Sequence, residues 1–328
     1  MRSRAIVKKL APLLISGLAL AAVFGMADLS AFSGLAARVC WGALPAVGVL
    51  LLAIVAAISW RWHSLLREAL PLPRAVLVSS LGVAGNQLLP LRGGDALRVV
   101  LSARGQSAPS LHAGVSAMAM EKVFDLLAVA AFGLASASAA LGTRSSEAGI
   151  NVIAVAVTIV GFAAAFLLTS RSGLLVGWVR TLARALRFSP RLYRHVFGPL
   201  HHIRQVASPI RVAVLLLQTG LIWIALYVLA YLAVAYVVGI PLNVSETMVL
   251  LFAGALGLAI PAAPSGLGTY HAAIVSAFVL LDRPAADGLV LAVAMHGVFF
   301  VGFCVIGTAA LAIVSRKIGS VRTRNENA

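Results

Sequence analysis

One apolar run of the sequence carries three charged side chains near its middle. The run covers residues 110–141 and contains Glu121, Lys122 and Asp125. In a helix, Glu121 and Asp125 share one face because they are four residues apart, whereas Lys122 points about 100° away. A charge at the centre of a bilayer costs about 2.5–3.5 kcal/mol, so we expect all three to face a bundle interior and to pair with the arginines of the 92–98 segment. They either lock two elements together or relay a proton, and the sequence does not separate these roles.

A second group of candidate residues precedes this helix, where a proline and two glycines interrupt another apolar run. Pro90 lacks an amide hydrogen and disfavours helix just before it, while Gly93 and Gly94 permit tight turns of the backbone. Arg92 and Arg98 flank the glycines, and the fork of a guanidinium matches a phosphate. The segment therefore predicts an anion site. The alternative is a cytoplasmic loop whose arginines only set the orientation in the membrane.

A third interruption lies near the C-terminal end. Two prolines and two glycines fall close together inside an apolar run: Pro261, Pro264, Gly266 and Gly268. They predict a tight turn between two half-helices, the second beginning near Thr269 as a plausible N-cap. The positive end of that helix dipole would suit an anion such as a lipid phosphate. Tyr270 and His271 stand on its first turn, and His296 in the last apolar run is the natural partner of His271, although such a histidine is often only a hydrogen-bonded core residue.

The elements that position these residues must be membrane helices. Of the 328 residues, 61% are hydrophobic and only 11% are charged, and the mean hydropathy is +1.00. A soluble domain of this size would be about 25% charged, so a soluble enzyme, a disulfide scaffold and a disordered chain are excluded. The net charge of +16 lies mostly in short breaks between apolar runs, which indicates cytoplasmic loops rather than nucleic-acid binding. Cys40 and Cys304 lack metal-ligand spacing and are expected to be small apolar side chains.

The apolar runs predict six full spans. These are residues 10–27, 40–59, 110–141, 150–169, 212–238 and 289–314. The first run could instead be a cleaved signal peptide. Of the 26 Lys and Arg residues, 22 fall on one side of these spans and three on the other, which places both termini in the cytoplasm. The largest loop, residues 171–211, is basic and contains an amphipathic stretch expected to lie on the anionic cytoplasmic leaflet.

Two broken segments, residues 74–91 and 247–281, do not fit as full spans. Because the loops flanking each one fall on the same side, each must enter the membrane and return as a re-entrant hairpin, one from either face. Such interrupted backbone is tolerated only where protein buries it or where it lines a wet cavity, and it marks transporter-type sites. The alternative is eight ordinary kinked spans. Either way, the fold class is an all-α polytopic transmembrane bundle, read as one domain over residues 1–328.

The three motifs together resemble a known family. N-x-x-P-L-R-G-G-D-x-x-R, E-K-x-x-D about 25 residues later, and P-x-x-P-S-G-x-G-T-Y-H resemble the membrane region of bacterial lysylphosphatidylglycerol synthases and its stand-alone flippase-like relatives. The order and spacing of the motifs over roughly residues 11–314 make the resemblance specific. Family members often carry glutamate where this chain has His271. The Gly-Glu pair that is common in the first motif of the family is Gly94-Asp95 in this chain. The chain ends at residue 328, so no aminoacyl-transfer domain is expected in it.

The resemblance implies a multi-pass protein of the bacterial inner membrane that moves or accommodates a lipid between leaflets, and not an enzyme. The expected headgroup ligands are Asn86, Arg92, Asp95, Arg98, Thr269, Tyr270 and His271. The expected intramembrane charge network is Glu121, Lys122, Asp125 and His296. The turns are assigned to Pro90, Gly93, Gly94, Pro261, Pro264, Gly266 and Gly268.

No cofactor and no metal is expected, and the sequence lacks the nucleotide-binding and hydrolase motifs of a pump or an esterase. The expected partners are membrane lipids and, in addition, lipid-biosynthesis enzymes. Two alternatives stay open: a membrane enzyme that uses Glu121 and Asp125 as an acid/base pair, and a scaffold for a biosynthetic complex.

Overall fold

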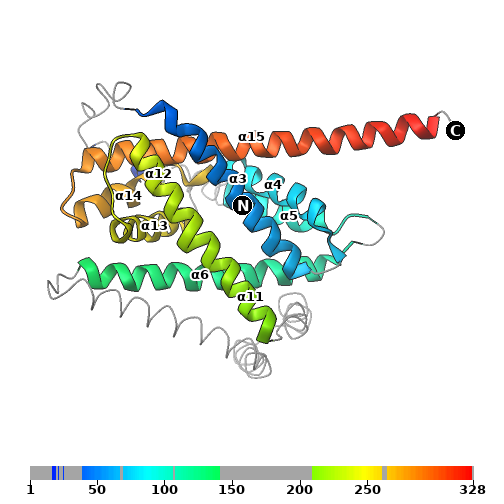
Figure 1. Ribbon diagram of the computed structural model, residues 1–328, viewed down its shortest axis with the longest axis horizontal. Coiled ribbons are helices and arrows are strands. Elements are labelled where there is room, and N and C mark those ends of the chain that lie inside the picture. Colours follow the sequence, from blue (N-terminus) through cyan, green and yellow to red (C-terminus); the bar gives the residue numbers. More distant parts are fainter. Residues whose placement is uncertain are drawn as a thin grey trace, which may run out of the picture.

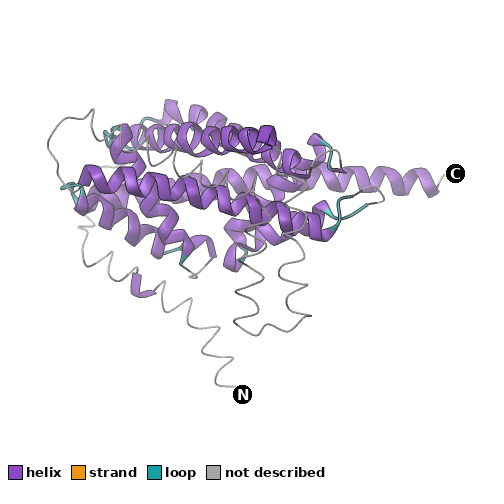
Figure 2. Cartoon of the chain, turned by 90° about the horizontal axis from the view of Figure 1, so that it is seen from below, coloured by secondary structure: helices purple, strands orange, loops and turns teal. Residues whose placement is uncertain are grey.

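The computed structural model describes residues 39–66, 69–105, 108–140, 209–260 and 264–326, together with isolated positions between 17 and 25. Every regular element in these ranges is helical, which confirms the all-α fold class (Figure 2). The predicted spans at 10–27 and 150–169 fall wholly or largely outside the described residues. The same holds for the loop 171–211, of which only the last three residues are described.

Four long helical stretches form the frame of the molecule. Three of them are long and apolar enough to cross a membrane: Trp41–Leu66, Ile210–Val237 and Ala285–Arg316. They contain α3 (Leu44–Leu66) after the short η2 (Trp41–Ala43), the continuous rod of α11 (Pro209–Gly220), η5 (Leu221–Tyr227) and α12 (Val228–Val237), and most of α15 (Ala285–Glu326). The fourth is α6 (Leu111–Ala140), which carries the three predicted charges. Figure 1 shows α6 and α15 on opposite sides of the bundle, with α3 and the α11–α12 rod crossing between them.

Two helical hairpins fill the space inside this frame. The first hairpin consists of α4 (Leu72–Leu88), the short turn η4 (Pro90–Arg92) and α5 (Gly93–Ser102). The sequence placed residues 92–98 in a loop after the broken segment, and this is wrong: they begin the returning half of the hairpin. The turn comes at Pro90, where the missing amide hydrogen and the restricted preceding residue end α4. At the open end, Arg74 donates to the carbonyl oxygens of Leu101 (3.2 Å) and Arg104 and so ties the two ends together.

The second hairpin consists of α13 (Val244–Ala259), the short turn η6 (Pro264–Gly266) and α14 (Thr269–Leu280). It begins with a capping box, in which Asn243 and Glu246 each accept a hydrogen bond from the backbone amide of the other. At its open end, Arg283 Nη1 lies 2.8 Å from Glu246 Oε1, and Arg283 Nη2 donates to the carbonyl oxygen of Pro241. Both hairpins are therefore closed at the base by an arginine.

The helices within each hairpin approach closely because glycines line the contact. A Cβ on Gly94 of α5 would overlap the carbonyl oxygen of Gly82 and the amide nitrogen of Asn86 on α4. A Cβ on Gly257 of α13 would lie 2.7 Å from the carbonyl oxygen of Thr269 on α14. Small residues allow backbones in membrane bundles to approach in this way, where no hydrophobic effect drives helices together.

The two hairpins point toward each other, and their tips meet. The turn η4 of the first contacts the turn η6 of the second, and η6 also contacts α4. In Figure 1 the first hairpin lies to the right and the second to the left of this meeting point. At 1.5 Å per residue, the 16 residues of α13 reach only about 24 Å, short of the roughly 30 Å of a hydrocarbon core. This geometry matches the predicted pair of opposed hairpins better than it matches eight full spans.

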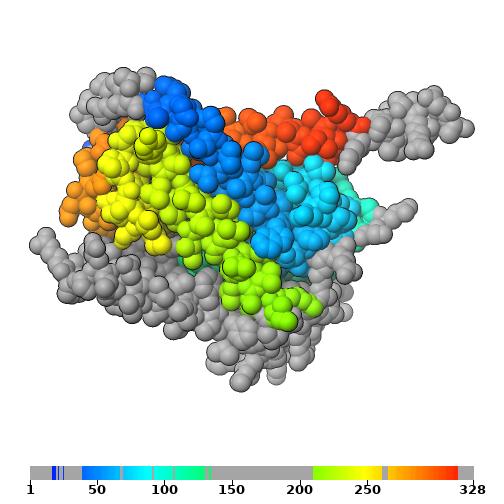
Figure 3. All heavy atoms as spheres, viewed as in Figure 1, coloured from blue at the N-terminus to red at the C-terminus, as the bar shows by residue number. Residues whose placement is uncertain are grey.

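Each hairpin has its own apolar core. Around the second hairpin, buried side chains of α12, α13, α14 and α15 form one cluster, with Leu250, Phe278 and Leu291 fully buried. Around the first, a smaller cluster joins α3, α4, α5, α6 and α11 through Trp62 and Phe124. In Figure 3, α3 runs beside α12 and α11 over one face of the molecule, with the first hairpin visible to the right of them and the second to the left.

Three arginines assigned to loops from the sequence lie inside the bundle. Arg61 is buried on α3, Arg98 is buried on α5, and Arg92 lies at the tip of the first hairpin, far from its base. Without these three, 19 Lys and Arg residues remain on the predicted cytoplasmic side, against three on the opposite side. The charge bias that predicts cytoplasmic termini therefore persists.

Candidate functional site

A cavity of about 360 Å³ lies where the two hairpin tips meet. Residues of both hairpins line it, together with residues of α3, α6, the η5–α12 rod and α15. Arg98 and Tyr270, which belong to different hairpins, both line this one cavity. Its two ends differ in chemistry: the charged wall is built on the first hairpin, α3 and α6, and the neutral wall on the second hairpin, α12 and α15.

Arg61 is the centre of the charged wall, and its role was missed in the sequence. Its Nη1 lies 2.8 Å from Asp125 Oδ1 and 3.1 Å from Thr219 Oγ1, and its Nη2 lies 3.6 Å from Glu121. The residue is only 2% exposed. The expectation that Glu121 and Asp125 both pair with arginines of the 92–98 segment is thus wrong for Asp125. Its partner is Arg61. Because Arg61 stands between Trp60 and Trp62, its local sequence is also typical of residues at the lipid headgroups.

Arg98 pairs with Glu121, as the sequence predicted. Its Nη2 lies 2.6 Å from Glu121 Oε1, and its guanidinium carbon lies 4.1 Å from the centre of the Trp62 ring. The Trp62 indole nitrogen in turn donates to Ser102 Oγ at 3.0 Å. Arg98 and Glu121 are each only 3% exposed, so this pair joins α5 to α6 from the inside. Breaking such a buried pair leaves an uncompensated charge, whose cost is about 3–5 kcal/mol.

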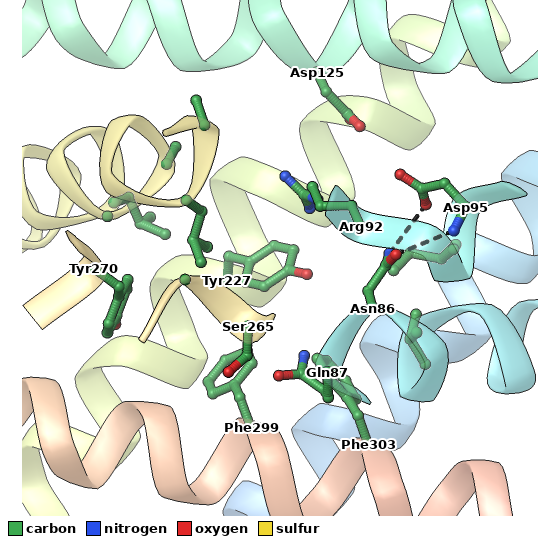
Figure 4. Close-up of a pocket in the computed structure, with 18 of the residues that line it drawn as sticks. Asn86, Gln87, Arg92, Asp95, Asp125, Tyr227, Ser265, Tyr270, Phe299 and Phe303 are labelled. Carbon is green, nitrogen blue, oxygen red and sulfur yellow. Dashed lines mark hydrogen bonds between the residues drawn. The ribbon is translucent and has the colours of Figure 1, made fainter. Parts of the chain in front are cut away.

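Asp95 and Asn86 bind each other across the first hairpin. Asn86 Nδ2 donates to Asp95 Oδ1, and the Asp95 amide donates to Asn86 Oδ1, both at 3.0 Å (Figure 4). Asp95 also forms an ion pair with Lys122, at 2.8 Å between Oδ2 and Nζ. The two residues line the cavity as expected, but their hydrogen-bonding capacity is largely used within the protein. They fix the start of α5 next to α4 and bring Lys122 into the charged wall.

Arg92 differs from every other cation of the cavity. Among the described residues it has no carboxylate within 4.0 Å and no hydrogen-bond partner, and its side chain is exposed. Its backbone has φ 55° and ψ 41°, a left-handed conformation that is uncommon for residues other than glycine. Figure 4 shows its side chain between Asp125 and Tyr227. The tip of the first hairpin therefore presents a guanidinium to the cavity with no internal counter-ion.

The neutral wall carries hydroxyl and imidazole groups. The Tyr231 and Tyr270 hydroxyls lie 3.0 Å apart, and Ser265 Oγ lies 2.9 Å from His296 Nε2. The rings of His271 and His296 stack with centroids 5.0 Å apart, so the expected contact between these histidines is confirmed. His296 lines the cavity, whereas His271 lies behind it, and its buried Nδ1 has no hydrogen-bond partner among the described residues.

The turn of the second hairpin is tight but differs from the expected form. Ser265, Gly266 and Gly268 have positive φ angles of 56°, 70° and 91°. The N-cap of α14 is Gly268, so the prediction of Thr269 as N-cap is wrong. The Thr269 hydroxyl donates to the carbonyl oxygen of Gly266 at 3.2 Å, and Thr269 is not among the residues that line the cavity. Pro261 lies outside the described residues.

Three aromatic residues of the η5–α12 rod also belong to the cavity and were missed. Trp223, Tyr227 and Tyr231 stand in or just after η5, which is a π-helical stretch. The Trp223 indole nitrogen donates to Asp125 Oδ1 at 2.8 Å. π-Helical turns often occur at functional sites. No sequence signal distinguished these three residues from ordinary members of an apolar span.

The arrangement can hold an anion at the charged wall and hydroxyl groups at the neutral wall. Within the ranges that the structure describes, no group of three or more His, Cys, Asp or Glu side chains is arranged to hold a metal ion. The carboxylates Glu121 and Asp125 face arginines rather than an open acid/base site.

A family model described as the lysylphosphatidylglycerol synthase TM region matches residues 9–307, which include both hairpins and the whole cavity. No curated protein and no solved structure matches the chain.

Proposed function

Because the chain belongs to the lysylphosphatidylglycerol synthase TM region family, we propose that it carries an anionic lipid between the leaflets of the bacterial inner membrane, with the lipid phosphate at Arg92. Membership of this family makes it a membrane protein related to lipid synthesis or translocation. The finer statement rests on the cavity between the hairpin tips.

The observation that carries the proposal is the unpaired guanidinium of Arg92. Arg92 is exposed in the structure, so its guanidinium is open to a ligand instead of being compensated inside the protein. Arg61, Arg98 and Lys122 already have carboxylate partners within 2.8 Å, whereas Arg92 has none among the described residues. Two oxygens of a phosphate could accept two parallel hydrogen bonds from the guanidinium of Arg92.

The position of Arg92 suits movement between leaflets. It stands where the tips of the two opposed hairpins meet. A headgroup bound there would therefore lie about midway between the bases of the two hairpins, which are at opposite ends of the bundle. Much of the remaining lining is apolar, including Leu251, Leu258, Phe299 and Phe303. Such a lining accepts the upper part of a lipid while its acyl chains stay in the bilayer.

The proposed roles of the other predicted ligands change with this geometry. Arg98 is buried against Glu121 and Trp62, so it supports the wall rather than the headgroup. Asn86 and Asp95 position the start of α5. Tyr270 stays a candidate headgroup ligand because it lines the cavity.

Lipid scrambling in proteoliposomes tests the proposal. Purified protein is reconstituted with a fluorescent phosphatidylglycerol, and the fraction of label accessible to an outside quencher is followed over time. We expect faster exchange than in protein-free vesicles, and a rate near the protein-free value for Arg92→Gln.

The matched control is Arg104→Gln, which removes the same charge from an exposed position at the base of the same hairpin. Its rate should equal that of the unchanged protein. Equal rates for Arg92→Gln and the unchanged protein would reject the role of Arg92, and no acceleration by the unchanged protein would reject the transport proposal itself.

Transport is favoured here over the alternative of a membrane enzyme. An acid/base pair needs a carboxyl group open to the substrate, and Glu121 and Asp125 are both held by arginines. Release of a modified lipid by the purified protein alone would favour the enzyme instead. Association with lipid-biosynthesis enzymes stays a prediction.

A further inference from the structure

We infer that the cavity selects lipids whose headgroup has a single phosphodiester charge and hydroxyl groups, and that it discriminates against headgroups bearing a cationic amine. This inference rests on the proposed function and names the substrate class of the same site. It comes from the charge balance of the charged wall and from the chemistry of the neutral wall.

The described residues that line the cavity have a surplus of one positive charge. Four of them are cations, namely Arg61, Arg92, Arg98 and Lys122. Three are carboxylates, namely Asp95, Glu121 and Asp125. One phosphodiester, which has one negative charge, neutralises the surplus. A lipid diphosphate has at least two negative charges and would leave the cavity negative.

Each carboxylate of the cavity already has a cation as its partner, and the one oxygen left without a hydrogen bond, Glu121 Oε2, belongs to a carboxylate held by two arginines. Each has a cation at close range: Asp95 has Lys122 at 2.8 Å, Glu121 has Arg98 at 2.6 Å, and Asp125 has Arg61 at 2.8 Å. Asp125 Oδ1 also accepts a hydrogen bond from the indole nitrogen of Trp223, at 2.8 Å. A cationic headgroup that approached one of these carboxylates would face the arginine or lysine already bound there at short range, and like charges repel.

The neutral wall offers hydrogen bonds without charge. Tyr231, Tyr270, Ser265 and His296 present three hydroxyl groups and one imidazole to the cavity. These groups both donate and accept, so they match the hydroxyl groups of a glycerol or a sugar. They supply no counter-charge to an amine.

A lipid competition experiment tests the selectivity. Protein in mild detergent is exposed to an equimolar mixture of phosphatidylglycerol and lysylphosphatidylglycerol, and the retained lipids are measured by native mass spectrometry. The same two lipids, fluorescently labelled, are then compared in the proteoliposome assay. We expect phosphatidylglycerol to be favoured by roughly tenfold in both, which corresponds to about 1.4 kcal/mol.

The outcomes separate the inference from the proposed function. Equal or preferred handling of the lysyl lipid would overturn the inference while leaving transport intact. Failure to retain or move either lipid would overturn the proposed function and the inference with it.

A charge added to the neutral wall provides the sharper test. Ser265→Asp places a carboxylate in the cavity, and Ser265→Asn is its uncharged control of nearly the same shape. Both residue types tolerate the left-handed backbone at this position, where φ is 56°. We expect Ser265→Asp to lose the preference for phosphatidylglycerol by roughly tenfold and Ser265→Asn to retain it.

His296→Glu, with His296→Gln as its control, repeats the test from α15 if the Ser265 variants do not fold. An unchanged preference in a folded carboxylate variant would overturn the inference.

Discussion

The first and second hairpins share one construction but carry different chemistry. Each has two short helices, a glycine contact between them, a tight turn with left-handed residues and an arginine at the base. The first is joined to its neighbours by buried ion pairs, whereas the second is packed in the larger apolar cluster and has neutral hydrogen bonds at its tip. One backbone arrangement, used twice, thus gives a cavity with a charged end and a neutral end.

The difference follows from what each hairpin packs against. The first lies beside α6, which carries Glu121 and Lys122 and so requires opposite charges in its surroundings. The second hairpin also packs against α6, but it does so where Phe252 of α13 approaches Gly133, away from the charged residues. Its other neighbours are apolar side chains of α12 and α15, such as Val234 and Leu291, which require no charge. The polar groups by which the second hairpin lines the cavity, such as Ser265 and Tyr270, lie at or next to its tip.

The largest expected effect comes from breaking the charged wall. Arg61→Met leaves Asp125 without the one cation that the described residues place within 4.0 Å of it, and it removes one of the two arginines beside Glu121. We therefore expect a loss of about 3–5 kcal/mol in unfolding free energy. The measurement is reversible unfolding of the protein in detergent. The exposed Arg104→Met is the control, and a loss no larger than in this control would contradict the structural role of Arg61.

A smaller loss is expected from the glycine contact of the first hairpin. A methyl group on Gly94 would overlap backbone atoms of α4, which cannot move independently, so Gly94→Ala should cost about 1–3 kcal/mol. Gly48→Ala on α3 is a matched control, because a Cβ there meets nothing within 4 Å. If the two variants unfold alike, the close approach of α4 and α5 is not as described.

The neutral wall should be less sensitive to loss of one group. Tyr231→Phe removes one of two paired hydroxyls and leaves that of Tyr270 without this partner, at a cost of about 1 kcal/mol. The comparison with Arg61→Met is direct, because each change removes one cavity-lining partner from its wall. A loss in Tyr231→Phe as large as in Arg61→Met would remove the distinction between the two walls.

The smallest effect is expected at the base of the second hairpin. The Arg283 and Glu246 side chains are partly exposed at 26% and 17%, so Arg283→Gln should cost at most about 0.5 kcal/mol. Added salt should reduce this difference further, because exposed pairs are screened. A salt-independent loss above that of Tyr231→Phe would show that the base arginine matters more than its exposure indicates.

The sequence predicted the helical elements well and the partners of the charged residues only in part. Prolines and glycines located both turns, since their backbone restrictions are local. The pairing of Arg98 with Glu121 was predicted because both belong to interrupted or charged apolar runs. Arg61 falls just after the predicted span 40–59 and was therefore expected outside the membrane, because an arginine at the end of an apolar run has the same local pattern at a headgroup and beside a buried carboxylate.

What the sequence by itself determined is the class of protein and the places where helices break: hydropathy, the count of basic residues and the Pro/Gly positions are properties of short segments. Only the tertiary structure decided which cation each carboxylate binds and that Arg92 has none among the described residues. Such pairings depend on distances between side chains up to 158 positions apart, as for Arg61 and Thr219, and those distances are fixed by helix packing rather than by any local pattern.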